Sequence, residues 1–188
     1  MQSDFAVELG RDDDTLEFPW SSPEGGVHYL DLKRHPELLP QIEEARRVPE
    51  LGEFLSTVNS PSCILETVKC DAWASTEINP EEKIFEAAHK FGSYVDLLFF
   101  DQKKRFSFPA HEGLAKQLAQ AAQLGPEIAA STEFIIRRCY YHMNDEEVRD
   151  GFYITFYLFG YGDKTGAREH WVIGLKFVQN AICELPAH

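Results

Sequence analysis

The sequence EFIIRRCYYHMNDEEVRDGFYITFYLFGYG, at residues Glu133–Gly162, decides the fold class that we expect. Two segments rich in aromatic and β-branched residues, Glu133–Met143 and Phe152–Gly162, flank a polar connection that ends in Gly151. Such residues between turn signals are typical of β-strands, and a polar link that ends in glycine suits an extended hairpin loop. We therefore expect the two segments to be antiparallel neighbours.

Two segments of the same kind, Cys63–Ser75 and Ser93–Asp101, lie earlier in the chain. Between them, Asn79–Glu82 has the sequence NPEE, which predicts the start of a short helix because asparagine, proline and acidic residues favour a helix N-terminus. We also expect brief strands at Val27–Lys33 and Phe106–Phe108.

Four further segments are expected to be helices. Prolines in the first turn and apolar residues at helical spacing predict Pro36–Arg47 and Pro49–Val58. The alanine-rich segment Glu112–Leu124 is ended by glycine and proline, and Ala167–Leu185 carries one apolar stripe. That stripe, which we expect to cover the sheet, consists of Trp171, Leu175, Val178 and Ile182.

Together these elements predict an α+β fold, a mainly antiparallel sheet of four to six strands with helices packed on one face. We expect an acidic N-terminal arm at residues 1–26, anchored by Trp20, followed by a single domain at 27–188. The order strand, helix, strand, strand occurs twice, which suggests duplicated halves at 27–102 and 103–188.

Two short matches accompany this doubled order. Lys69-Cys70 would correspond to Arg138-Cys139, and Gly92-Ser93-Tyr94 to Gly151-Phe152-Tyr153. The order resembles that of the gyrase-inhibitor-like ligand-binding domains, and this resemblance implies two halves that meet around a small-molecule cleft. A helix-grip-like sheet around the C-terminal helix explains the last helix equally well.

The composition excludes several kinds of partner. The formal net charge of −13, from 31 acidic and 18 basic residues, would repel a phosphate backbone and an anionic membrane surface, so we expect neither nucleic acid nor a membrane as partner. No apolar run approaches the roughly 20 residues of a membrane helix, and Met1–Gly10 lacks a signal-peptide pattern, so we expect a cytoplasmic protein. The four cysteines form no C-x-x-C pair, and we expect no disulfide framework, metal or cofactor.

Alternation along the strands indicates where a small molecule would bind. The face of Cys63–Ser75 expected to point away from the helices carries Leu65, Thr67, Lys69, Asp71 and Trp73. The last strand presents hydroxyl-bearing rings on its outer face. For the third strand, alternation does not decide which face points away from the helices. Aromatic walls with a few converging polar groups are typical of ligand pockets. The predicted ligand-binding residues are Lys69, Asp71, Trp73, Tyr94, Asp96, Arg138, Tyr140, Tyr153 and Tyr157.

Two alternatives use the same residues. An acid–base enzyme would employ Glu66 or Asp96 as general base, although a buried carboxylate paired with Lys69, Arg137 or Arg138 is the more common arrangement. No nucleophile motif supports catalysis. A homodimer or partner-binding protein would instead cover the aromatic face, and would bind no ligand.

Overall fold

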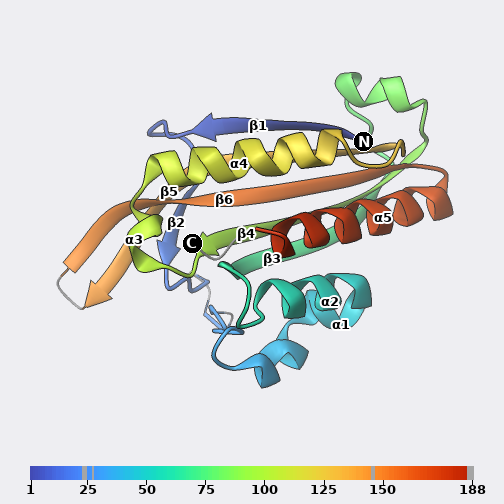
Figure 1. The fold of residues 1–188 in the computed structure, drawn as a ribbon. Coiled ribbons are helices and arrows are strands. Elements are labelled where there is room, and N and C mark those ends of the chain that lie inside the picture. The colour runs from blue at the N-terminus through green and yellow to red at the C-terminus, as the bar shows by residue number, and fades with distance from the viewer. Residues whose placement is uncertain (23–24, 27, 145–146, 186–188) are drawn as a thin grey trace.

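The computed structural model describes residues 1–22, 25–26, 28–144 and 147–185, which form one mixed sheet with helices packed against it (Figure 1). The strand order is β1-β5-β6-β4-β3, and β2 also pairs with β5. The strands are β1 (Gln2–Glu8), β2 (Thr15–Phe18), β3 (Leu65–Ser75), β4 (His89–Phe99), β5 (Ala130–Asn144) and β6 (Glu147–Gly162).

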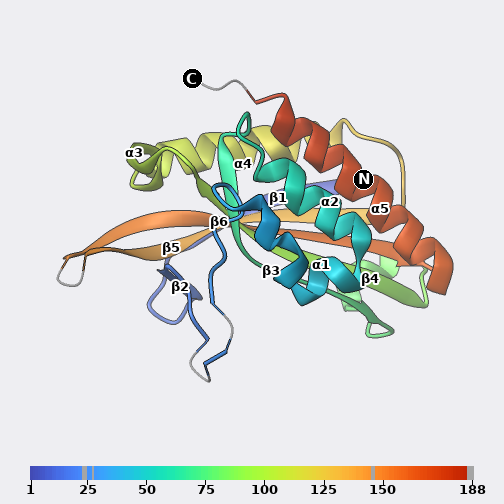
Figure 2. The same ribbon diagram turned by 90° about the horizontal axis from the view of Figure 1, so that it is seen from below.

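All the described helices except η2 lie on one side of the strands (Figure 2). They are η1 (Pro36–Gln41), α1 (Glu43–Arg47), α2 (Pro49–Val58), η2 (Pro80–Phe85), α3 (Gln102–Arg105), α4 (Phe108–Gln123) and α5 (Lys164–Cys183), of which η1 and η2 are 3-10 helices. None of the described helices is long and apolar enough to cross a membrane. Helices α2, α4 and α5 confirm three of the helical predictions, with shifted ends, whereas the predicted segment Pro36–Arg47 is divided into the 3-10 helix η1 and the short helix α1.

The α+β class is confirmed, but the sheet is mixed rather than mainly antiparallel. The four predicted long strands pair in antiparallel fashion, β3 with β4, β4 with β6 and β6 with β5. The segment expected to be an arm instead supplies β1 and β2, which both run parallel to β5. Apolar and polar residues alternate only weakly in β1 and β2, so their sequences do not predict strands. They become strands because the unpaired backbone groups at the edge of β5 need hydrogen-bond partners.

Three smaller expectations differ from the structure. Around Val27–Lys33, the described residues contain only an isolated bridge between Ser21 and His28. Phe106 and Ser107 link α3 to α4, and Phe108 begins α4, where Ser107 accepts a hydrogen bond from the main chain of Ala110 and caps the helix. The NPEE segment forms only the 3-10 helix η2, and β4 begins early, at His89.

The core lies between the sheet and helices α2, α4 and α5. The predicted stripe of α5 is buried, and the Trp171 indole donates to the Ser93 hydroxyl at 2.8 Å. Close packing of α5 requires glycine at Gly160, where a β-carbon would lie 2.2 Å from the carbonyl oxygen of Ala167. Helices α2, α4 and α5 pack on the same face of the sheet. The sheet therefore does not surround the C-terminal helix alone, as the helix-grip-like alternative expected.

The two antiparallel hairpins each follow a helix, α2 before β3-β4 and α4 before β5-β6, and they join through β4 and β6. The two sequence matches nevertheless fall at different register positions. Cys139 pairs with Gly151, whereas Gly92 pairs with Trp73 and Cys70 pairs with Val95. If the two glycines correspond, Trp73 rather than Cys70 corresponds to Cys139. Duplication stays a prediction.

Candidate ligand-binding site

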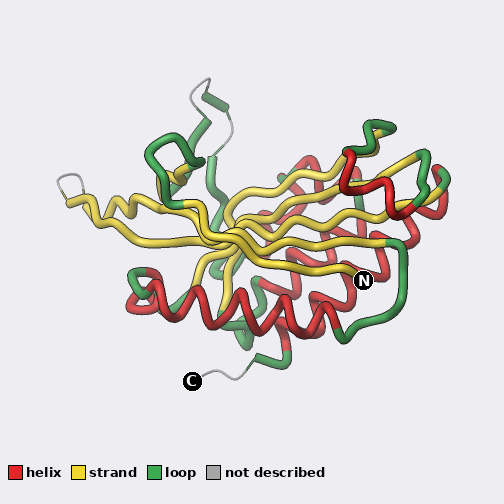
Figure 3. Tube along the Cα trace, turned by 90° about the horizontal axis from the view of Figure 1, so that it is seen from above, coloured by secondary structure: helices red, strands yellow, loops and turns green. Residues whose placement is uncertain are grey.

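The sheet face opposite the helices, here the open face, carries a cluster of aromatic rings. Figure 3 shows helices along one side of the strands, while the N-terminal loops and η2 lie on the other side, near opposite ends. Between them lies the aromatic quartet, defined as Trp73, Tyr94, Tyr157 and Phe159, all half-buried. Successive ring centroids around this quartet are 6.5, 6.0, 6.2 and 6.0 Å apart, so the rings form one closed group.

Glycine makes this arrangement of rings sterically feasible. Gly92 on β4 pairs with Trp73 on one side and Phe159 on the other. A β-carbon at Gly92 would lie 2.8 Å from the Phe159 ring and 3.1 Å from the Trp73 ring. The two side chains therefore lean over the glycine and meet, as is common where a strand glycine leaves space for neighbours.

Beside the quartet, the open face contains a buried carboxyl group. Asp96 is 4% exposed, and its Oδ1 accepts a hydrogen bond of 2.8 Å from the Thr155 hydroxyl. Burial raises the pKa of Asp96 to about 6, against the lowering effects of the Thr155 hydrogen bond and of the positive charge of Lys69. Desolvation thus dominates over these favourable contacts.

The cation that accompanies Asp96 on β5 is Arg137, whereas Arg138 and Tyr140, which were predicted for the site, have the opposite parity on β5. Arg137 is 8% exposed; it donates to Thr155 Oγ1 at 3.3 Å and forms an ion pair of 2.8 Å with Glu8. Arg138 belongs to the opposite parity and donates to the carbonyl oxygen of Leu9. Arg137 lies on the open face because its neighbours Phe134 and Ile136 pack in the helix-side core. Since side chains alternate along a strand, odd-numbered residues next to them point to the opposite face.

A bulge in β3 corrects the predicted faces of that strand. The register shifts between Thr67 and Cys70, where two residues of β3 lie opposite Asp96 alone. Leu65 packs in the helix-side core before the bulge and Ala72 packs there after it, although the two differ in parity. Leu65 and Thr67 therefore do not share a face with Asp71 and Trp73, since an extra residue reverses the alternation.

At the bulge, the edge of β3 forms the floor of a pocket of about 510 Å³, here the β3 pocket. One wall comes from Trp20 and from the residues Leu30 and Leu32, and the other comes from η1, α1 and their junction, with Ile42 and Glu44. The complete lining is Trp20, His28, Leu30, Leu32, Gln41, Ile42, Glu43, Glu44, Arg46, Leu55, Thr67, Val68, Lys69, Cys70, Asp71 and Tyr94.

Two charged side chains of the β3 pocket are already engaged. The Lys69 ammonium lies 4.9 Å from the centroid of the Trp20 ring, a cation–π distance. Asp71 accepts a hydrogen bond of 2.9 Å from Arg47. These contacts hold the polar groups at the rim and leave the apolar walls between them.

The other predicted carboxylate, Glu66, is not free. It forms a buried ion pair with Arg105, whose guanidinium lies near the rings of Phe18 and Tyr141. Burial raises the pKa of Glu66, while the charge of Arg105 lowers it. Pairing is confirmed as the arrangement, but the partner is Arg105, because the bulge directs Lys69 elsewhere and Arg137 pairs with Glu8.

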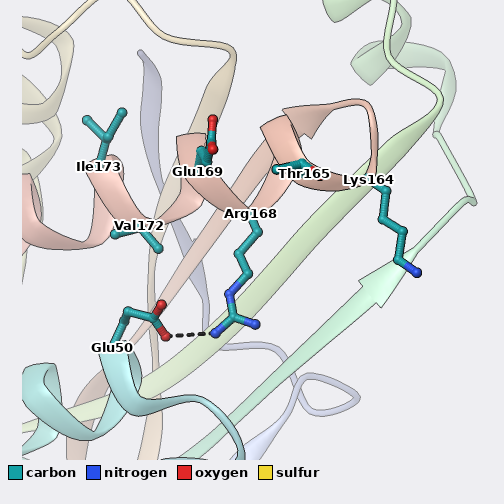
Figure 4. Close-up of a pocket in the computed structure, with 7 residues that line it drawn as sticks. All are labelled: Glu50, Lys164, Thr165, Arg168, Glu169, Val172 and Ile173. Atoms are coloured by element: carbon teal, nitrogen blue, oxygen red, sulfur yellow. Dashed lines mark hydrogen bonds and ion pairs between the residues drawn. The ribbon is translucent and has the colours of Figure 1, made fainter.

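A second hollow, of about 600 Å³, lies between α2 and α5 (Figure 4). Figure 4 shows Arg168 reaching across it to Glu50, and their ion pair measures 2.9 Å. Its lining comes mainly from one exposed flank of α5, including Ile173, and contains none of the predicted site residues. The hollow is an open surface feature bridged by its own ion pair.

The structure thus gathers part of the predicted site. Lys69, Asp71 and Tyr94 line the β3 pocket, and Tyr94 joins it to the aromatic quartet. The other predicted residues on the open face are Trp73, Asp96, Tyr153 and Tyr157, of which Tyr153 is buried in a second core cluster. Sequence reasoning missed the wall residues of the pocket, because their approach to β3 from the N-terminal loop and from η1 and α1 depends on long-range packing.

The chain was compared with protein-family models, curated proteins and solved structures. No family model, curated protein or solved structure matches it.

Proposed function

We propose that this protein binds a small, partly apolar molecule in the β3 pocket, beside the aromatic quartet. The observation that supports the proposal is the lining itself. Leu30, Ile42 and the ring of Trp20 provide apolar wall, and half of the lining is polar or charged, including Lys69 and Asp71. Cavities of several hundred Å³ that combine apolar walls with converging polar groups are the usual form of small-molecule sites.

The tryptophans offer a direct test. Trp20 lines the pocket, Trp73 lies in the quartet, and Trp171 is fully buried on the inner face of α5. In a Trp73→Phe variant, the emission that responds to a ligand in the pocket comes from Trp20. We expect compounds from a broad library of small apolar molecules to shift or quench it.

The matched control is Trp20→Phe in the same background, which leaves only Trp171 and should lose the response. A spectrum that stays unchanged across the whole library would refute binding in the β3 pocket. A response that survives in Trp20→Phe would place the ligand elsewhere.

Acid–base chemistry at Asp96 is a second candidate, because this carboxyl group is buried on the open face beside the quartet, with the Thr155 hydroxyl as its hydrogen-bond donor. The pKa of about 6 is close to neutral pH, where a general base works best. Turnover of a bound compound that is lost in Asp96→Asn but kept in Glu66→Gln would support it. Binding without turnover would leave the protein as a binding module.

A further inference from the structure

The free edge of β3 is capped by side chains on both sides of the β3 pocket. Before the bulge, the main-chain N–H of Thr67 donates to Asn59 Oδ1 at 3.1 Å, and Lys33 donates to the carbonyl oxygen of Leu65 at 2.6 Å. After the bulge, Arg47 donates to the carbonyl oxygen of Ala72 at 2.6 Å. An edge strand that is covered in this way cannot recruit another strand.

Between these caps, the main-chain groups of Cys70 point outward. The N–H of Ala72 donates to Asp71 Oδ1 at 2.7 Å, so it faces the edge rather than β4. Cys70 pairs with Val95 and Ala72 pairs with Ser93, so the register between these two positions of β3 is not interrupted. In an antiparallel ladder, residues two apart share their direction, so Cys70 also turns both its N–H and its C=O to the edge.

Cys70 is also a floor residue of the β3 pocket. In the described part of the chain, no cap of the kind found at Thr67 and Ala72 reaches its main chain. The pocket therefore offers one hydrogen-bond donor and one acceptor from the same residue, and Trp20 and Tyr94 belong to the same lining. A ligand that satisfies both groups gains more than one that leaves them unpaired.

The charges of the pocket favour a ligand without net charge. Lys69 and Arg46 are opposed by Glu43 and Glu44, and Asp71 is neutralised by its ion pair with Arg47. A charged ligand would meet side chains of both signs in the lining, and no single partner would compensate for the cost of its desolvation. A neutral ligand avoids that cost.

We infer that the β3 pocket takes a neutral, planar ligand with a lactam-type edge, whose C=O accepts from the N–H of Cys70 and whose adjacent N–H donates to the C=O of Cys70. This inference rests on the proposed function and names the ligand class of the same pocket. A longer extended peptide is disfavoured, because the neighbouring edge positions at Thr67 and Ala72 are occupied by Asn59 and Arg47.

Two matched probes test the ligand class, 2-quinolinone and 1-methyl-2-quinolinone. Both are planar and neutral, but the methyl group removes the N–H and blocks the edge. With ¹⁵N-labelled protein, we expect 2-quinolinone to move the Cys70 amide resonance downfield and to perturb the Trp20 indole resonance. The methylated probe should bind about tenfold more weakly or worse, as the loss of one hydrogen bond and a steric clash imply.

Variants separate main-chain from side-chain recognition. Cys70→Ala keeps the main-chain groups and should bind 2-quinolinone as the natural chain does, whereas Trp20→Ala should weaken both probes. Equal affinity for the two probes, or a Cys70 amide that does not move, would overturn the lactam inference.

The two proposals fail in distinguishable ways. If neither quinolinone perturbs Trp20 at millimolar concentration while another library compound changes its emission, the ligand class is wrong and the proposed function stands. If no compound of the library changes Trp20 emission, both are refuted.

Discussion

The buried ion pair between Glu66 and Arg105 is a residue-scale feature with a measurable role. Removal of one partner from a buried pair leaves an uncompensated charge, which costs roughly 3–5 kcal/mol. We expect Arg105→Met to lower the free energy of unfolding in urea at pH 7 by about 3 kcal/mol.

The control is Lys116→Met, which breaks the exposed pair between Lys116 and Glu112 on α4 and should cost no more than about 0.5 kcal/mol. Equal losses in the two variants would show that the Arg105 pair is not shielded from water.

Asp96 gives the protein a defined pH dependence. Its pKa is raised from 3.8 to about 6 in the folded state, so between these values the folded chain binds more protons than the unfolded chain. Stability is therefore lost as pH rises from about 4 to about 6, by about 3 kcal/mol at about 1.4 kcal/mol per pKa unit, and the loss stays constant above that range.

The variant Asp96→Asn carries no charge at any pH and retains an oxygen for the Thr155 hydroxyl. We expect its stability relative to the natural chain to increase by about 3 kcal/mol between pH 4 and pH 7, as measured by urea unfolding at several pH values. Parallel pH curves for the two proteins would contradict a raised pKa at Asp96.

At the scale of elements, the packing of α5 on β6 depends on Gly160. An alanine there would place its β-carbon 2.2 Å from the carbonyl oxygen of Ala167 and 2.4 Å from the main-chain nitrogen of Trp171, both on α5. Since backbone cannot move aside as a side chain can, we expect Gly160→Ala to lower the free energy of unfolding by about 3 kcal/mol or more.

Gly113→Ala is the matched control. A β-carbon at Gly113 would meet nothing within 4 Å, and the residue is exposed within α4. We expect this substitution to stabilise the protein by about 0.5–1 kcal/mol, because alanine is the better helix former. Thermal unfolding of the Gly160→Ala and Gly113→Ala variants measures both effects. Similar changes of the unfolding temperature in the same direction would refute the close approach at Gly160.

At the scale of the whole molecule, β1 and β2 cover the outer edge of β5. Phe18 also packs on Tyr141, with ring centroids 5.7 Å apart. A chain that begins at residue 19 would expose β5 as a long edge strand, and such edges pair with other chains. We expect this truncated chain to self-associate in sedimentation velocity and to lose hydrogen-exchange protection along β5.

The full chain is the reference for that comparison, and a truncated chain that stays monomeric with β5 protected would contradict the expectation. The homodimer hypothesis for the natural chain stays a prediction. Sedimentation of the full chain at micromolar concentration tests it.

Much of the fold was predictable from local patterns. The four long strands, the main helices and the apolar stripe of α5 depend on residue periodicity and on turn residues within each segment. Lys69, Asp71 and Tyr94 were predicted as site residues because strand alternation and aromatic content mark an outer face. These features are local, so they can be predicted from the residues of one segment without knowledge of what it packs against.

The sequence by itself therefore determined the four long strands, most of the main helices, the antiparallel pairing of β5 with β6 and the aromatic character of one sheet face. Only the tertiary structure decided that β1 and β2 join β5, that Arg137 rather than Arg138 accompanies Asp96, and that the β3 bulge opens a pocket. The physical reason is that a register shift of one residue exchanges the faces of a strand without changing its pattern, and that choice is made by long-range packing.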